Sequence, residues 1–153
     1  MYFGLALTTH LLAAIIWIGG MFFAYTCLRP SLGETLAPAE RARLLTATFS
    51  RFFHWVWIAI PILFATGLYM AFTRYGVMGT WPIFLHVMFG VAIIMSLLFF
   101  HIFFAPFKRL KRAMAQKDPQ QAGAAIGQIR MIVLLNLALG IIVAIAASGG
   151  RYI

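Results

Sequence analysis

The chain has 153 residues, of which twelve are Lys or Arg and three are Asp or Glu, so its formal net charge is +9. Charged residues make up only 10% of the chain, whereas typical soluble domains carry about 25%. Hydrophobic residues make up 63%, which excludes both an ordinary soluble domain and a disordered chain.

Four segments contain no charged residue: 1–28, 52–73, 75–107 and 131–150. A helix needs about 20 residues to cross a hydrocarbon core of about 30 Å, and each segment is long enough. The sequence therefore predicts an all-α membrane protein in which residues 1–153 form one domain, a bundle of four transmembrane helices. The predicted spans are about 3–28, 52–73, 82–105 and 129–148.

The first predicted span, 3–28, is expected to end at Arg29-Pro30, because proline interrupts helical hydrogen bonding. Pro38 suits the first position of a new helix, which would extend from the loop towards span 52–73. Pro61 lies near the middle of that second span and is expected to kink it.

The third predicted span, 82–105, is expected to end or kink at Pro106. Further along, Asp118 has the character of a helix N-cap and Pro119 that of a first helical residue. This helix would project from the membrane before entering it as span 129–148. Both long loops are thus expected to carry short amphipathic helical extensions.

The basic residues lie almost entirely in the two long loops, where cytoplasmic Lys and Arg normally gather. Only Arg74 and Arg151 lie on the other side of the predicted membrane. The sequence therefore predicts that both termini lie outside. Topology signals of this kind account for the basic excess without a nucleic-acid partner.

The predicted spans contain four histidines and no carboxylate. Ionisable groups within a bilayer are costly, so these histidines are candidates for a functional role. Counting residues along the spans places His10 and His86 in the outer half and His54 and His101 in the inner half. His86 and His101 would stand about 22 Å apart along one helix and only about 60° apart around it.

Two stacked histidine pairs are typical of a membrane cytochrome with one or two b-type haems, which transfers electrons within or across the bilayer. His10 and His86 would ligate an outer haem iron, and His54 and His101 an inner one. Gly90 would leave room for the macrocycle, and Arg74 and Arg151 would pair with propionates.

Plainer interpretations of the same residues remain open. The imidazoles of His10 and His86 could instead be hydrogen-bonded between helices, to Thr8, Thr9 or Asn136. His54 could be an interfacial residue, and glycines in membrane helices often mark close packing.

The segment from His10 to Phe23 reads His-Leu-Leu-Ala-Ala-Ile-Ile-Trp-Ile-Gly-Gly-Met-Phe-Phe, and its His-x6-Trp-x-Gly-Gly pattern resembles the CopD family of bacterial inner-membrane proteins. The basic segment 106–112 and the ending 147–152 also resemble short members of that family. The resemblance implies a multi-pass protein of the bacterial inner membrane, with both termini periplasmic, linked to copper or to haem. The same span is similar to HemJ-type protoporphyrinogen oxidases, although Met88 stands where their third-span lysine is expected.

Three functions therefore remain open: haem-based electron transfer, copper import or binding, and porphyrinogen oxidation. Copper(I) would bind soft ligands together with histidine, and the chain offers Met21, Met70, Met88, Met95 and Cys27. A quinone or a periplasmic protein would serve as redox partner, and a homo-oligomer is possible. The protein would be an oxidoreductase if it is an enzyme.

Overall fold

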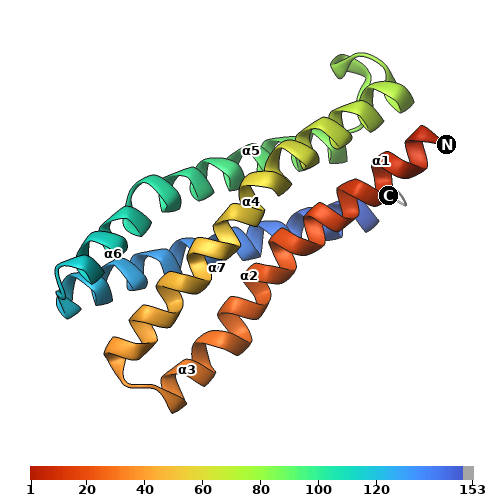
Figure 1. The fold of residues 1–153 in the computed structure, drawn as a ribbon. Coiled ribbons are helices and arrows are strands. Elements are labelled where there is room, and N and C mark those ends of the chain that lie inside the picture. The colour runs from red at the N-terminus through yellow and green to blue at the C-terminus, as the bar shows by residue number, and fades with distance from the viewer. Residues whose placement is uncertain (150–153) are drawn as a thin grey trace.

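The computed structural model describes residues 1–149, in which four long helices run side by side (Figure 1). They comprise Tyr2–Thr35, Pro38–Tyr75, Ile83–Ala115 and Pro119–Gly149. Each is long and apolar enough to cross a membrane, which confirms the predicted all-α class and the four spans.

The first helix changes its winding along its length. It consists of α1 (Tyr2–Ala14), the π-helical turn η1 (Ile15–Gly19), α2 (Gly20–Phe23), the π-helical turn η2 (Ala24–Leu28) and α3 (Arg29–Thr35). The expectation that it ends at Pro30 was wrong, because the helix continues to Thr35. Pro30 is tolerated since it is the second residue of α3, where the preceding π-helical turn has already left the regular i→i−4 pattern.

The second long helix, α4 (Pro38–Tyr75), is continuous and includes the expected extension of the first loop. It continues through Pro61, whose side chain is exposed. A short connection follows, with Gly76 at φ +74°, where a residue without a side chain is favoured. The η3 turn (Met78–Thr80) then leads to Trp81, whose indole Nε1 donates to the carbonyl oxygen of Gly76 at 3.0 Å.

The third long helix divides at Ala105 into α5 (Ile83–Phe104) and α6 (Pro106–Ala115), so the expected break at Pro106 is confirmed. In α6 one face is buried and the opposite face carries exposed Lys108, Arg109, Lys111 and Arg112. The last helix, α7 (Pro119–Gly149), begins after Asp118, whose Oδ1 accepts a hydrogen bond from the Gln121 amide at 3.0 Å. This bond confirms the expected N-cap.

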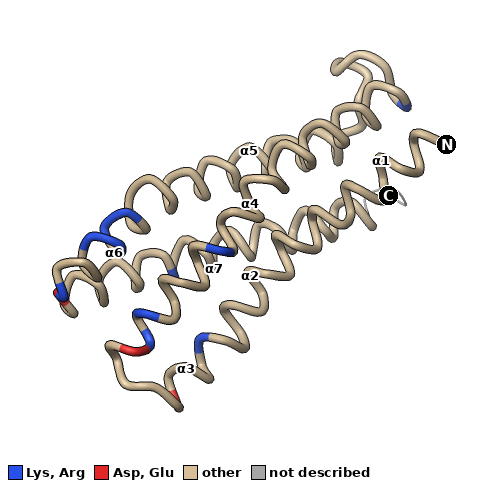
Figure 2. Tube along the Cα trace, in the orientation of Figure 1, with Lys and Arg blue, Asp and Glu red and all other residues tan. Residues whose placement is uncertain are grey.

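The helices pack in a definite order. α1 lies along α4, and α5 lies along α7. α6 covers the beginning of α7, and the η1, α2 and η2 parts of the first helix also contact α7. Basic residues gather at the end of the bundle that holds α3 and α6, far from the N-terminus (Figure 2). The separation of charge along the bundle agrees with the counting used for the spans; the orientation of the termini in the membrane stays a prediction.

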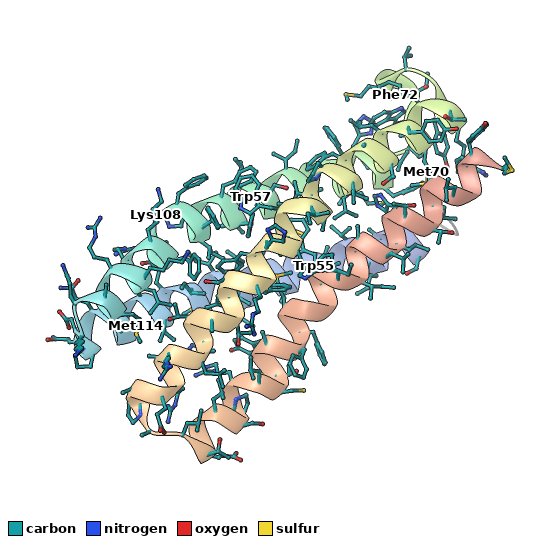
Figure 3. All side chains as sticks on the ribbon, viewed as in Figure 1. Trp55, Trp57, Met70, Phe72, Lys108 and Met114 are labelled. Atoms are coloured by element: carbon teal, nitrogen blue, oxygen red, sulfur yellow. The ribbon has the colours of Figure 1, made fainter. Side chains whose placement is uncertain are left out.

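Aromatic side chains fill the half of the core nearer the basic end. The ring of Phe53, which is 2% exposed, lies 4.9 Å from that of Phe107 and 5.6 Å from that of Phe99. Trp57 of α4 stacks on Phe100 of α5 at 5.2 Å, on the α5 side of the bundle (Figure 3). Such pairs contribute about 0.5–1.5 kcal/mol each beyond simple burial, so this region is tightly held.

Candidate functional site

His10 of α1 lies half-buried against α4. Its Nδ1 is 2.8 Å from the hydroxyl oxygen of Thr66. That hydroxyl also lies 2.6 Å from the carbonyl oxygen of Ile62, which only accepts, so the Thr66 hydrogen is donated there. The Thr66 oxygen must then accept from His10 Nδ1–H. The neutral imidazole is therefore fixed as the Nδ1–H tautomer, and its Nε2 keeps a lone pair free for a ligand.

Gly67 allows this arrangement. A Cβ atom built at Gly67 would lie 3.1 Å from Cε1 and 3.6 Å from Nδ1 of His10. The absence of a side chain thus lets the imidazole sit against α4. The partners considered from the sequence, Thr8 and Thr9, donate instead to carbonyls of their own helix, at 3.0 and 2.9 Å.

The other three histidines have exposed side chains. His86 lies in the first turn of α5, where its Nδ1 is 3.4 Å from the carbonyl oxygen of Pro82 and its ring is 5.9 Å from that of Trp81. His54 and His101 follow or precede the buried residues Phe53 and Ile102. Because neighbouring helical residues diverge by about 100°, their imidazoles point away from the core.

An interior haem does not fit this packing. The core beside His54 and His101 is filled by the rings of Phe53, Phe99, Phe103 and Phe107. In the outer half, His10 contacts α4, and the side chain of His86 is exposed. The expected bis-histidine ligation therefore remains a prediction without support from the arrangement of the helices.

The remaining residues expected around a haem have varied surroundings. A Cβ at Gly90 would meet no atom within 4 Å, so nothing packs closely there. Arg74 is exposed and lies over the Tyr75 ring at 5.9 Å. Arg151 lies outside the described residues. Gly20 is a close-packing position, since a Cβ atom built there would overlap the Phe52 ring.

A second group of polar and soft side chains lies inside the bundle. Asn136 of α7 is 1% exposed, and its Nδ2 donates to the carbonyl oxygen of Met95 in α5 at 3.3 Å. Its Oδ1 is buried and has no hydrogen-bond partner. A buried polar atom without a partner is costly, so it calls for an explanation.

Two methionine side chains are also buried inside the bundle. Met95 is 3% exposed, and its Cε lies 3.3 Å from the Cβ position of Gly140, one turn from Asn136 on α7. The side chain of Ile18 approaches the same position to 3.0 Å, so Met95 reaches the junction of three helices. Met21 follows Ile18 by about one turn and is 2% exposed. The bundle interior thus contains two buried thioether side chains and one buried amide oxygen without a hydrogen-bond partner.

The winding of the first helix sets where Met21 points. Met21 belongs to α2, which lies between the π-helical turns η1 and η2. Such turns rotate the following residues relative to a regular helix and are frequent at functional sites. Nothing in the sequence indicates these π-helical turns. For Asn136, by contrast, the sequence already suggests a hydrogen bond between helices. Within residues 1–149 no group of three or more His, Cys, Asp or Glu side chains converges on one metal position.

Comparison with known proteins gives one match. The family described as Copper resistance protein D (CopD) matches residues 46–149, from the first third of α4 to the end of α7. The matched range includes His54, His86, His101 and the buried Met95 and Asn136. No match was found among curated proteins or among solved structures.

Proposed function

The chain belongs to the CopD family, and from this premise we propose that it binds copper(I) within the membrane and passes it across. The observation that carries the proposal is the soft interior: the thioether side chains of Met21 and Met95 are both buried inside the bundle. Copper(I) prefers thioether and imidazole ligands to hard oxygen ligands. Copper is here the cargo of the protein.

The charge distribution of the interior suits a monovalent cation. No charged residue occurs in the segments 1–28, 52–73, 75–107 and 131–150. An ion held by neutral sulfur and nitrogen ligands is bound weakly enough to leave again, as passage requires. A buried carboxylate or thiolate would hold it more tightly.

The first helix presents soft donors at three depths. His10, Met21 and Cys27 are separated by roughly 16 and 9 Å along it, at about 1.5 Å per residue. His10 has its Nε2 free, Met21 is buried, and Cys27 is exposed towards the basic end. In the proposed route, copper(I) enters near His10, is held between Met95 and Met21, and leaves near Cys27.

X-ray absorption of the purified chain loaded with copper(I) tests this binding. We expect strong sulfur scattering in the wild type and a clear decrease in the double variant Met21→Leu/Met95→Leu, because leucine has similar volume and no sulfur; the sulfur of Cys27 remains in both. Met131→Leu is the matched control, since Met131 is 61% exposed. Unchanged sulfur scattering in the double variant, or equal loss in the control, would refute the interior site.

Haem-based electron transfer is a second candidate. The observation in its favour is that both His10 and His86 have Nδ1 within hydrogen-bond distance of an oxygen, at 2.8 and 3.4 Å. Metal-ligating histidines usually have one nitrogen oriented in this way and bind through the other. A haem bound on the outside of the bundle would give oxidised and dithionite-reduced visible spectra, and a colourless protein from haem-sufficient cells would exclude it.

A further inference from the structure

An apolar pocket with two arginines lies towards the basic end of the bundle. Residues from four elements line it: η2, α3, α4 and α7. Its wall includes Tyr25, Phe49, Ile126 and Val133, and both Arg29 and Arg130 border it. We call this the Arg29–Arg130 pocket.

The two guanidinium groups in this pocket have no acidic counterpart. Arg29 lies over the Tyr25 ring at 5.8 Å, which leaves its hydrogen-bond donors free. Within residues 1–149 neither guanidinium takes part in a hydrogen bond or an ion pair, in contrast to Arg41 and Arg109. Two positive charges that border the same pocket repel each other, so an anion at the pocket would be stabilised.

The depth of the pocket matches that of a phospholipid headgroup. Arg29 directly follows the first charge-free segment, and Arg130 directly precedes the last one. Tyr25 and Val133 lie about one turn further into the predicted membrane on the same two helices. A molecule with an anionic head at the guanidinium groups would therefore place its apolar part beside Tyr25 and Val133.

From this arrangement we propose that the Arg29–Arg130 pocket binds one anionic phospholipid of the surrounding membrane. The two guanidinium groups hold its phosphate, and the first part of an acyl chain lies against the apolar wall. Guanidinium groups bind phosphate oxygens through paired, charge-assisted hydrogen bonds, which is stronger than a general attraction to a charged surface. The lipid would brace α3 and α4 against α7.

Native mass spectrometry of the full chain in detergent tests the proposal. Phosphatidylglycerol and phosphatidylcholine with the same acyl chains are added separately. We expect the wild type to retain one phosphatidylglycerol through detergent removal and to retain phosphatidylcholine at least about tenfold less. Equal retention of both lipids would overturn the proposal. Inorganic phosphate is added as a third probe, and its retention to the same extent as phosphatidylglycerol would also overturn it.

Two sets of variants locate the binding. Arg29→Gln/Arg130→Gln should retain at least about tenfold less phosphatidylglycerol. Arg43→Gln/Arg51→Gln loses the same charge from exposed positions of α4 and should retain it like the wild type. Ile126→Trp keeps both arginines but fills the pocket, so it should also lose the lipid. If the double arginine variant does not fold, this variant still tests whether the lipid binds in the pocket. Retention unchanged in Ile126→Trp, or lost equally in the control, contradicts a lipid in this pocket.

Discussion

Replacing Asn136 with leucine separates a functional from a structural role for the buried amide. Leucine has the same branching and the same number of side-chain heavy atoms as asparagine. The substitution removes one hydrogen bond, from Nδ2 to the carbonyl oxygen of Met95 at 3.3 Å. Hydrogen bonds between membrane helices average about 0.6 kcal/mol. The substitution also removes the buried Oδ1, which has no partner and whose burial costs about 1–3 kcal/mol.

The difference between these two terms predicts that Asn136→Leu leaves the free energy of unfolding unchanged or raises it by up to about 2 kcal/mol. Reversible unfolding in mixed micelles of a mild detergent and dodecyl sulfate measures it. Copper(I) transfer should fall at the same time, because the unpaired Oδ1 is a polar atom that a cation passing through the apolar interior would contact. A loss of more than about 1 kcal/mol, with copper transfer unchanged, would show that Asn136 only holds helices together.

Two glycine substitutions test the contacts of the first helix. Gly20→Ala should lower the free energy of unfolding by about 1–3 kcal/mol, because its Cβ would overlap the Phe52 ring. Gly19→Ala is the matched control, because no atom lies within 4 Å of a Cβ built at Gly19. This variant should be as stable as the wild type or more stable by up to about 1 kcal/mol. Equal effects of the two substitutions in the same unfolding assay would contradict the packing described. Gly67→Ala should displace the imidazole of His10 and weaken copper(I) binding at the outer end, as measured by competition with a copper(I) chelator, and unchanged binding would remove His10 from the route.

Much of the fold can be predicted from the positions of the charged residues and from the prolines and aspartate at helix ends. Charges cannot lie in the hydrocarbon core, so their positions delimit the spans without knowledge of any contact. Pro106 and Asp118 act through the local backbone, and both predictions hold in the structure. Pro30 does not end the helix, because its effect depends on the π-helical turn before it, which no local feature of the sequence indicates.

The candidate site was much harder to predict, because depth alone does not determine direction. Residue counting places His54 and His101 at similar depths, but the bulkier Phe53 and Ile102 occupy the inward direction and turn both imidazoles outward. The partner of His10 is Thr66, a residue 56 positions away in the sequence. Only the packing of α1 on α4 brings these two together.

Copper(I) uptake into proteoliposomes measures whether the chain passes copper(I) across a membrane. Vesicles with the full chain and an internal copper(I) chelator are compared with protein-free vesicles and with vesicles that contain Met21→Leu/Met95→Leu. We expect vesicles with the wild type to take up copper(I) faster than protein-free vesicles. The double variant should lose most of this difference, whereas Met131→Leu should keep it. Uptake by the wild type no faster than by protein-free vesicles, or undiminished uptake by the double variant, would contradict the proposed function.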